Sequence, residues 1–326
     1  MQATVEPETA GNPQSEQKWV RSSLRRLSTQ LGHDGHPASP PTIARLLDKL
    51  GYALHVNAKK LEARADRPDR QAQFAHITEQ RVAFAAAGQP IISIDTKKKE
   101  LVGNFKNAGV TWSQEATAVN VHDFLTDALG RAVPYGIYEP LRNQGSVYVG
   151  TSADTPQFAV DVIARWWHST GYLHYPAAEE LLILADGGGS NAYRSRLWKQ
   201  QLQVQLCDRD GLTVTVCHYP TGCSKWNPVE HRLFGPISVN WAGKPLLTWD
   251  ALLAYIRGTK TTTGLAVQAF LHEATYTTGG TVSDAEMEAL NLERHSVCPD
   301  WNYTIRPHSD GRSTTPAELR KREVVS

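Results

Sequence analysis

In the middle of the chain, short apolar runs alternate with longer segments of helical periodicity, and this order constrains the fold more than any other feature. Five of these segments are typical of strands: residues 91–94, 132–138, 146–150, 181–185 and 212–217. Two helical patterns separate the later strands, at residues 156–170 and 191–207. Strands joined by helices in this way predict a mixed α/β sheet with helices on its faces.

A basic segment precedes this sheet. Residues 17–60 carry eight lysines and arginines and two acidic residues, although the formal net charge of the whole chain is only +1. The segment contains two amphipathic helical patterns joined by a turn rich in glycine, histidine and proline. Ser39 is a candidate N-cap of the second helix, whose first turn tolerates Pro40 and Pro41. The pattern predicts an all-α helix-turn-helix segment.

The second of these helices carries candidate DNA contacts. Thr42, Arg45 and Lys49 lie away from its apolar face, where they can enter a major groove. A helical hairpin with a solvated face explains the same pattern. The basic bias of the segment favours DNA.

Three carboxylates fall at strand ends or at a helix start. Asp95 ends the first strand, Asp186 follows residues 181–185, and Glu230 lies in the first turn of a helix after the last strand. Strand ends meet at one edge of an α/β sheet, so the three acids can form one site made only of oxygen ligands. Such a site suits Mg²⁺ or Mn²⁺.

Each acid also has a purely structural explanation. Asp95 can begin a turn, and Asp186 can stabilise the glycine-rich loop that follows it. Glu230 can occupy the N3 position of a capping box that begins at Asn227. Glu230 also shares a helix face with apolar residues, where a carboxylate needs a partner such as a metal ion. The residues alone leave these alternatives open.

Several long segments are more specific than any short motif. They include IISIDTKKKELVGNFKN, FAVDVIARWW, LLILADGGGSN, SKWNPVEHRLF and DWNYTI. These segments resemble the Rhodopirellula-type DDE transposases of bacterial insertion sequences over about residues 17–307. Two departures stand out: Cys223 replaces the small hydroxylated residue expected there, and members of the family carry more chain before this N-terminus. We therefore expect an N-terminally truncated copy.

The resemblance implies a ribonuclease-H-like core in which Asp95, Asp186 and Glu230 are the catalytic acids and hold two Mg²⁺ or Mn²⁺ ions. It implies metal-dependent cleavage of DNA at insertion-sequence ends and transfer of the cut strand into target DNA. The implied partners are transposon-end DNA and target DNA, and we expect a homo-oligomer to handle both ends.

Further candidate DNA contacts surround the acids. Lys97 and Lys99 can reach phosphates from the end of the first strand, although a solvated run of charge explains them equally well. Ser190 and Asn191 follow a glycine run, where backbone N–H groups can approach a phosphate.

The segment before Glu230 adds three more candidates. Lys225 and Asn227 offer polar contacts to DNA, and Trp226 offers a ring on which a base can stack. For Trp226, packing in the core is the favoured alternative.

Two other functions compete with transposition. One is a metal nuclease on the same fold that cuts without strand transfer, and the other is a truncated, domesticated DNA-binding protein. An assay for joined DNA ends tests for strand transfer, and metal-dependent nicking separates an enzyme from a binding protein.

Five parts are expected along the chain: a flexible lead-in (1–16), a helix-turn-helix DNA-binding segment (17–65), the ribonuclease-H-like DDE core (66–245), a C-terminal extension (246–308) and a disordered tail (309–326). No segment approaches about 18 consecutive apolar residues, and the N-terminus lacks a basic region followed by an apolar one. We expect no membrane partner and a bacterial, cytoplasmic, nucleoid-associated location.

Overall fold

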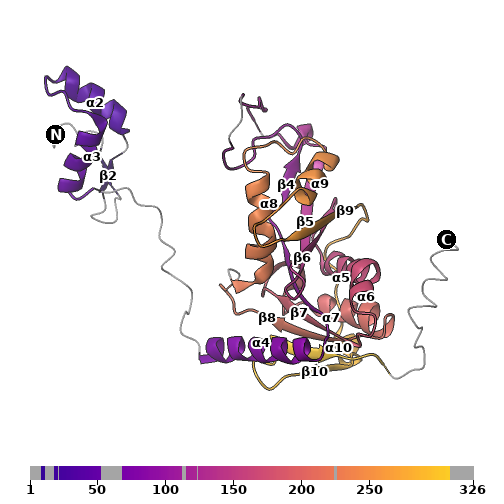
Figure 1. Cartoon of the computed structure of the whole chain (residues 1–326). Coiled ribbons are helices and arrows are strands. Elements are labelled where there is room, and N and C mark those ends of the chain that lie inside the picture. The colour runs from indigo at the N-terminus through magenta and orange to yellow at the C-terminus, as the bar shows by residue number, and fades with distance from the viewer. Residues whose placement is uncertain are drawn as a thin grey trace. The chain divides into compact units, whose positions relative to one another are not determined.

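The computed structural model describes residues 9–11, 18–20, 22–52, 68–111, 115–122, 124–223 and 226–308. Lys225, the predicted tail and most of the predicted lead-in lie outside these residues. The chain divides into two compact units, Met1–Ala63 and Arg64–Ser326 (Figure 1).

Two short strands and two helices lie in the described residues of the first unit. Strands β1 (Thr9–Gly11) and β2 (Lys18–Val20) pair antiparallel, so part of the predicted lead-in is a strand. Helices α2 (Leu24–His33) and α3 (Pro40–Lys49) pack through Leu27, Leu31 and Ile43. The Ser39 side chain caps α3 and its prolines lie in the first turn, as the sequence predicts.

The second unit is built on one mixed sheet. Its strands are β3 (Ile91–Thr96), β4 (Glu100–Val102), β5 (Gly130–Glu139), β6 (Gln144–Gly150), β7 (Glu180–Ala185), β8 (Thr213–His218), β9 (Ala266–His272), β10 (Leu292–Arg294) and β11 (Asn302–Ile305). Their order is β10-β11-β8-β7-β3-β5-β6-β9, with β4 paired to β5. Strands β3, β7 and β8 are parallel to one another, and β5 is antiparallel to both β3 and β6.

Helices connect and cover these strands. The α-helices are α4 (Pro68–Ala86), α5 (Pro156–Trp166), α6 (Tyr172–His174), α7 (Arg196–Leu202), α8 (Gly235–Asn240), α9 (Trp249–Arg257) and α10 (Asp284–Glu288). The π-helical segments are η3 (Trp167–Gly171), η5 (Gln203–Asp208) and η7 (Glu230–Phe234), and 3-10 turns occur at η2 (Leu125–Asp127) and η4 (Gly189–Asn191). The helix predicted from residue 191 begins only at Arg196, because the Ser195 side chain caps it there.

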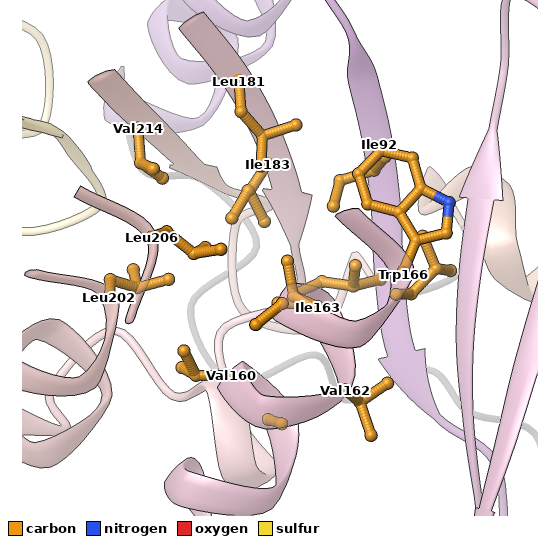
Figure 2. Packing of buried hydrophobic residues seen from close by; sticks show 14 of the residues in the cluster. Ile92, Val160, Val162, Ile163, Trp166, Leu181, Ile183, Leu202, Leu206 and Val214 are labelled. Carbon is orange, nitrogen blue, oxygen red and sulfur yellow. The ribbon is translucent and has the colours of Figure 1, made fainter. Parts of the chain in front are cut away.

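The apolar core lies on both faces of the sheet. On one face, Ile163 and Trp166 of α5 pack among Ile92, Ile183 and side chains of α7 and η5 (Figure 2). Helix α4 and the η7, α8 and α9 segments contribute to separate buried clusters. Each fully buried aliphatic side chain contributes about 1.5–3 kcal/mol to stability. None of the described helices is both long enough and apolar enough to cross a bilayer.

The structure contains three strands near the C-terminus that the sequence analysis does not predict. Strand β9 pairs parallel with β6, and β11 pairs antiparallel with β8, so residues 266–305 complete both sides of the sheet. Strands β10 and β11 have only three and four residues, and β9 shows no simple alternation of buried and exposed positions. Pairing with distant strands, rather than a local pattern, defines β9 and β11, and β10 pairs with the neighbouring β11.

The order β6-β5-β3-β7-β8, with only β5 antiparallel among the central strands, is that of a ribonuclease-H-like sheet. The predicted fold class, a mixed sheet with flanking helices, is confirmed for the second unit.

Candidate active site

Two of the predicted acids lie side by side at the carboxyl-terminal ends of two neighbouring central strands. Strands β3 and β7 are parallel, and their register pairs Ile94 with Ala185. Asp95 and Asp186 are the next residues on the two strands, so the pairing itself brings them together. Both strands are buried along almost their whole length, which fixes this register against a slip.

Glu230 reaches the same strand ends through a clasp between β3 and the segment before η7. The Ser93 hydroxyl donates to Asn227 Oδ1 at 2.5 Å and accepts from the Val229 N–H at 3.0 Å. Asn227 Nδ2 donates to the Ile94 carbonyl at 3.0 Å. The start of η7 is therefore bonded to β3 two residues before Asp95. The Asn227 side chain, which the sequence offers as the cap of this helix, bonds to β3 instead.

Two glycines allow η7 to lie close against the sheet. A Cβ at Gly136 of β5 would lie 2.5 Å from the Phe234 ring. A Cβ at Gly145 of β6 would overlap the Leu233 side chain. Side chains at these positions would push η7, and Glu230 with it, away from β3.

The electrostatics of the site follow from this crowding. Burial, repulsion from Asp186 and a hydrogen bond with the Glu230 carboxylate raise the pKa of Asp95 to about 9. Burial also raises the pKa of Asp186, and the Gly188 N–H and the Asn191 amide partly oppose this shift. Glu230 acts on both aspartates, so the three carboxylates form one interacting group.

A fourth carboxylate, Asp154, belongs to the same group. It precedes α5, and its Oδ1 accepts from the Thr96 hydroxyl at 3.2 Å. Its charge helps raise the pKa of Asp186, and Lys99 Nζ lies 3.9 Å from its Oδ2. Sequence reasoning missed Asp154 because an acid before a helix is usually explained by the helix itself. The available signal was that Asp154 follows the predicted strand at residues 146–150 (β6), which runs parallel to β3 with β5 between them.

Tyr135 places a buried hydroxyl beside these acids. It lies on β5 opposite Thr96, and its side chain is fully buried. Its hydroxyl has no hydrogen-bond partner among the described residues. Burial and the charges of Asp95, Asp154 and Asp186 raise the pKa of Tyr135 well above its usual value. The Tyr135 O–H thus remains a neutral donor that a water or substrate oxygen at this site can satisfy.

The donor set fits a hard divalent cation. It consists of carboxylate oxygens, which suit Mg²⁺ or Mn²⁺. Among the described residues, no group of three or more His, Cys, Asp or Glu side chains is placed so that it could hold a metal ion as it stands. An open group of mutually repelling acids is what a cation that also binds water and substrate oxygens requires. Such a cation would offset the repulsion that raises the pKa of Asp95.

The predicted DNA contacts near β3 and η7 divide into exposed and buried residues. Lys97 is held by Glu100 at 3.0 Å and by the Trp241 ring, with its Nζ 4.6 Å from the ring centroid. Lys99 is exposed and faces Asp154. Trp226 is 57% exposed, so the favoured expectation that it packs in the core is wrong.

The remaining predicted contacts are buried and hold the acids in place. Asn227 is completely buried in the clasp on β3. Asn191 donates to Asp186 at 3.0 Å, and the Ser190 hydroxyl lies 3.4 Å from that of Thr96. In this structure these three side chains contact the protein and position the acid site.

A basic pocket lies next to the acid site. It has a volume of about 430 Å³ and is lined by Lys98, Lys99, Lys106 and Arg131, with Glu100 as its acidic member. Lys99 joins it to the acid site through Asp154.

In the first unit, the exposed face of α3 carries the predicted residues. Arg45 and Lys49 are exposed and lie one turn apart, whereas Ile43 is buried against α2. Thr42 is partly buried, and its hydroxyl lies 2.9 Å from that of Ser39. Arg45 and Lys49 therefore form a basic stripe on the side away from α2.

Fold and sequence together identify the chain. A ribonuclease-H-like sheet with acids at its strand ends is the arrangement expected for the catalytic domain of a DDE transposase. The family model described as Rhodopirellula transposase DDE domain matches residues 1–307, so the chain belongs to this family of DDE transposases. The resemblance seen in the sequence is thereby confirmed. Comparison with proteins of curated function found no significant match.

Solved structures show a distant likeness. The Mos1 transposase paired-end complex with left transposon end is 12% identical, with a TM-score of 0.39 over 71% of this chain and 64% of that chain. A pre-cleavage Mos1 transpososome is 11% identical with a TM-score of 0.38, and a mariner Mos1 paired end complex with Mg is 12% identical with a TM-score of 0.39. Both matches cover 71% of this chain and 64% of the other chain. The chain thus spans less than two thirds of the length of these structures.

Proposed function

We propose that this chain is a DNA transposase that cleaves the ends of its insertion sequence and joins them to target DNA, with Asp95, Asp186 and Glu230 as its catalytic acids. The observation that carries the proposal is the interacting group of carboxylates at the end of β3 and β7 in a chain of this family. Among the described residues, no salt bridge joins these three acids to a lysine or arginine, so a cation from solution would balance their charge.

The residues would act in distinct ways. Two Mg²⁺ or Mn²⁺ ions, when bound, would supply charge neutralisation at the transferring phosphate and activation of the attacking oxygen. Asp95, Asp186 and Glu230 would hold them. Asn227 and Ser93 would orient Glu230, and Asn191 would orient Asp186. Asp154 would add negative charge, and Tyr135 O–H would donate to an oxygen at the site.

The partners follow from the charges around the acids. The basic pocket would bind phosphates of the DNA that leads to the acid site, through Lys98, Lys99, Lys106 and Arg131. Arg45 and Lys49 of α3 would contact the transposon end. Transposition handles two ends, so the active form would be a homo-oligomer on DNA. We place it in the bacterial cytoplasm at the nucleoid.

The test is an assay with DNA that carries the terminal sequences of its own insertion element. The wild-type protein should nick this DNA and join it to a target plasmid with Mg²⁺ or Mn²⁺, and should do neither with EDTA. Glu230→Gln should abolish both products, whereas the matched change Glu288→Gln, at an exposed position of α10, should leave them unchanged. Nicks without joined products would indicate a nuclease, and binding without nicks would indicate a DNA-binding protein.

A further inference from the structure

A second charged feature lies outside the acid site. A pocket of about 350 Å³ is lined by four cations, Arg194, Arg196, Lys199 and Arg294, and by the acid Asp300. We name it the Lys199 pocket. With Asp284, which pairs with Arg196, four positive charges face two negative charges, and the net charge of about +2 around a small volume attracts an anion.

Lys199 is the unusual member of this pocket. Its side chain is only 5% exposed, and its Nζ donates to the Tyr193 carbonyl at 2.8 Å. The same Nζ lies 5.2 Å from the centroid of the Tyr303 ring. Within the described part of the chain, no carboxylate forms a salt bridge with it. A lysine is rarely buried without a paired anion, because burial penalises its charge.

The surroundings of Lys199 also disfavour its charge. Burial, together with the nearby charges of Arg294 and Arg196, lowers the pKa of Lys199 to about 8, whereas Asp300 acts in the opposite direction. A negative group inside the pocket would raise the pKa of Lys199 again and so stabilise its charged form.

The arginines of the pocket keep unused donors. Arg196 pairs with Asp284 at 2.6 Å and Arg294 with Asp300 at 2.8 Å, in each case through Nη1. A guanidinium carries five N–H donors, so N–H groups remain on both. Arg194 is exposed and lies over the Tyr193 ring at 5.1 Å. Guanidinium groups of this kind bind phosphate oxygens in pairs.

The pocket adjoins the loop that follows Asp186. The Tyr193 ring packs edge-on against His218, with ring centroids 6.2 Å apart. His218 in turn lies 2.8 Å from the Asp186 carbonyl through its Nδ1. Tyr193 therefore lies between the pocket and the strand end that carries the acid.

We propose that the Lys199 pocket binds a backbone phosphate of the DNA strand that occupies the acid site, with Lys199 and Arg194 as its principal contacts. This inference rests on the proposed function. The exposed arginines at the rim suit a phosphodiester that is part of a chain lying on the surface, rather than a small molecule enclosed in a cavity. The bound phosphate would help to fix the position of the DNA strand relative to Asp186.

The test measures the salt dependence of binding to end-containing duplex DNA, by fluorescence anisotropy in EDTA. Arg194→Ala and Lys199→Met should each weaken binding several-fold and reduce the slope of log K against log salt by about 0.9, the value for one lost phosphate contact. Lys260→Ala removes an exposed cation elsewhere in the same unit and serves as the matched control. Thermal melts identify any variant that fails to fold, and Arg194→Ala changes only an exposed side chain.

The outcomes separate this inference from the function on which it rests. Unchanged affinity and slope in Arg194→Ala, with wild-type protein that nicks and joins DNA, would overturn the inference and leave the transposase assignment in place. Wild-type protein that neither binds nor nicks would overturn both. A thermal stabilisation by millimolar inorganic phosphate that disappears in Lys199→Met, without any change in the DNA slope, would assign the pocket to free phosphate instead.

Discussion

Replacing Asp95 by asparagine should make the metal-free protein more stable while it abolishes DNA cleavage. Asparagine keeps the shape of aspartate, and its Oδ1 can still accept the Thr96 N–H that lies 2.7 Å from Asp95 Oδ1. Burial, Asp186 and Glu230 raise the pKa of Asp95 to about 9, from 3.8. The folded protein therefore takes up a proton at pH 7 that the unfolded chain does not hold.

The size of the effect follows from that proton. Neutral pH lies about 3 units above the unfolded pKa, and each unit corresponds to about 1.4 kcal/mol. Relative to low pH, the free energy of unfolding of the wild-type protein at pH 7 is therefore lower by about 4 kcal/mol, and Asp95→Asn does not undergo this loss. Because the folded pKa is the higher one, the contribution of Asp95 is fully present below about pH 4 and is lost as the pH rises through about 9.

The assay is urea unfolding in EDTA between about pH 5 and 8, followed by tryptophan fluorescence. From pH 5 to pH 7 the free energy of unfolding of the wild type should fall by about 3 kcal/mol relative to the variant. Saturating Mg²⁺ should restore much of this loss in the wild type and little in the variant, because a bound cation stabilises the ionised acids. Parallel pH profiles for the two proteins in EDTA would refute the electrostatic argument.

Three further changes test other parts of the structure. Asn227→Ala leaves the Ile94 carbonyl and the Ser93 hydroxyl without their partner, so it should cost about 1–3 kcal/mol for each buried group in thermal or urea unfolding and should also slow cleavage; unchanged stability would contradict the clasp. Gly145→Ala crowds Leu233 and should destabilise by about 1–3 kcal/mol in the same assay. Replacing Arg45 and Lys49 by alanine should weaken end-DNA binding and lower its salt slope, whereas an unaffected slope would make α3 purely structural.

The central sheet is predictable from the sequence because its strands are buried and apolar. Residues 91–94 and 181–185 read as strands without any knowledge of their partners, and their following acids mark the strand ends. The strands after residue 260 are not predictable in this way. Strand β11 has four residues, and its burial comes from pairing with β8, which a local pattern does not report.

The sequence points to the acids of the candidate site, but it does not show which residues hold those acids in place. A carboxylate after a buried strand is visible in a sequence, whereas the role of Asn227 depends on Ser93, which lies 134 residues earlier. Sequence reasoning placed Asn227 at a helix cap or on DNA because both are common uses of asparagine. Tyr135 becomes recognisable when the pairing of β3 with β5 places it opposite Thr96. The role of Asp154 depends on its hydrogen bond with the Thr96 hydroxyl, which the sequence does not show.

The clasp between Ser93 and Asn227 also determines when the acid site exists. Asp95 and Asp186 are synthesised before Glu230, and Glu230 reaches them only after η7 has docked on β3. A nascent chain that ends before η7 therefore carries two acids without the third. The strand-cutting chemistry that we propose would be withheld until the catalytic fold has closed, which would protect the DNA of the producing cell from its own incomplete transposase.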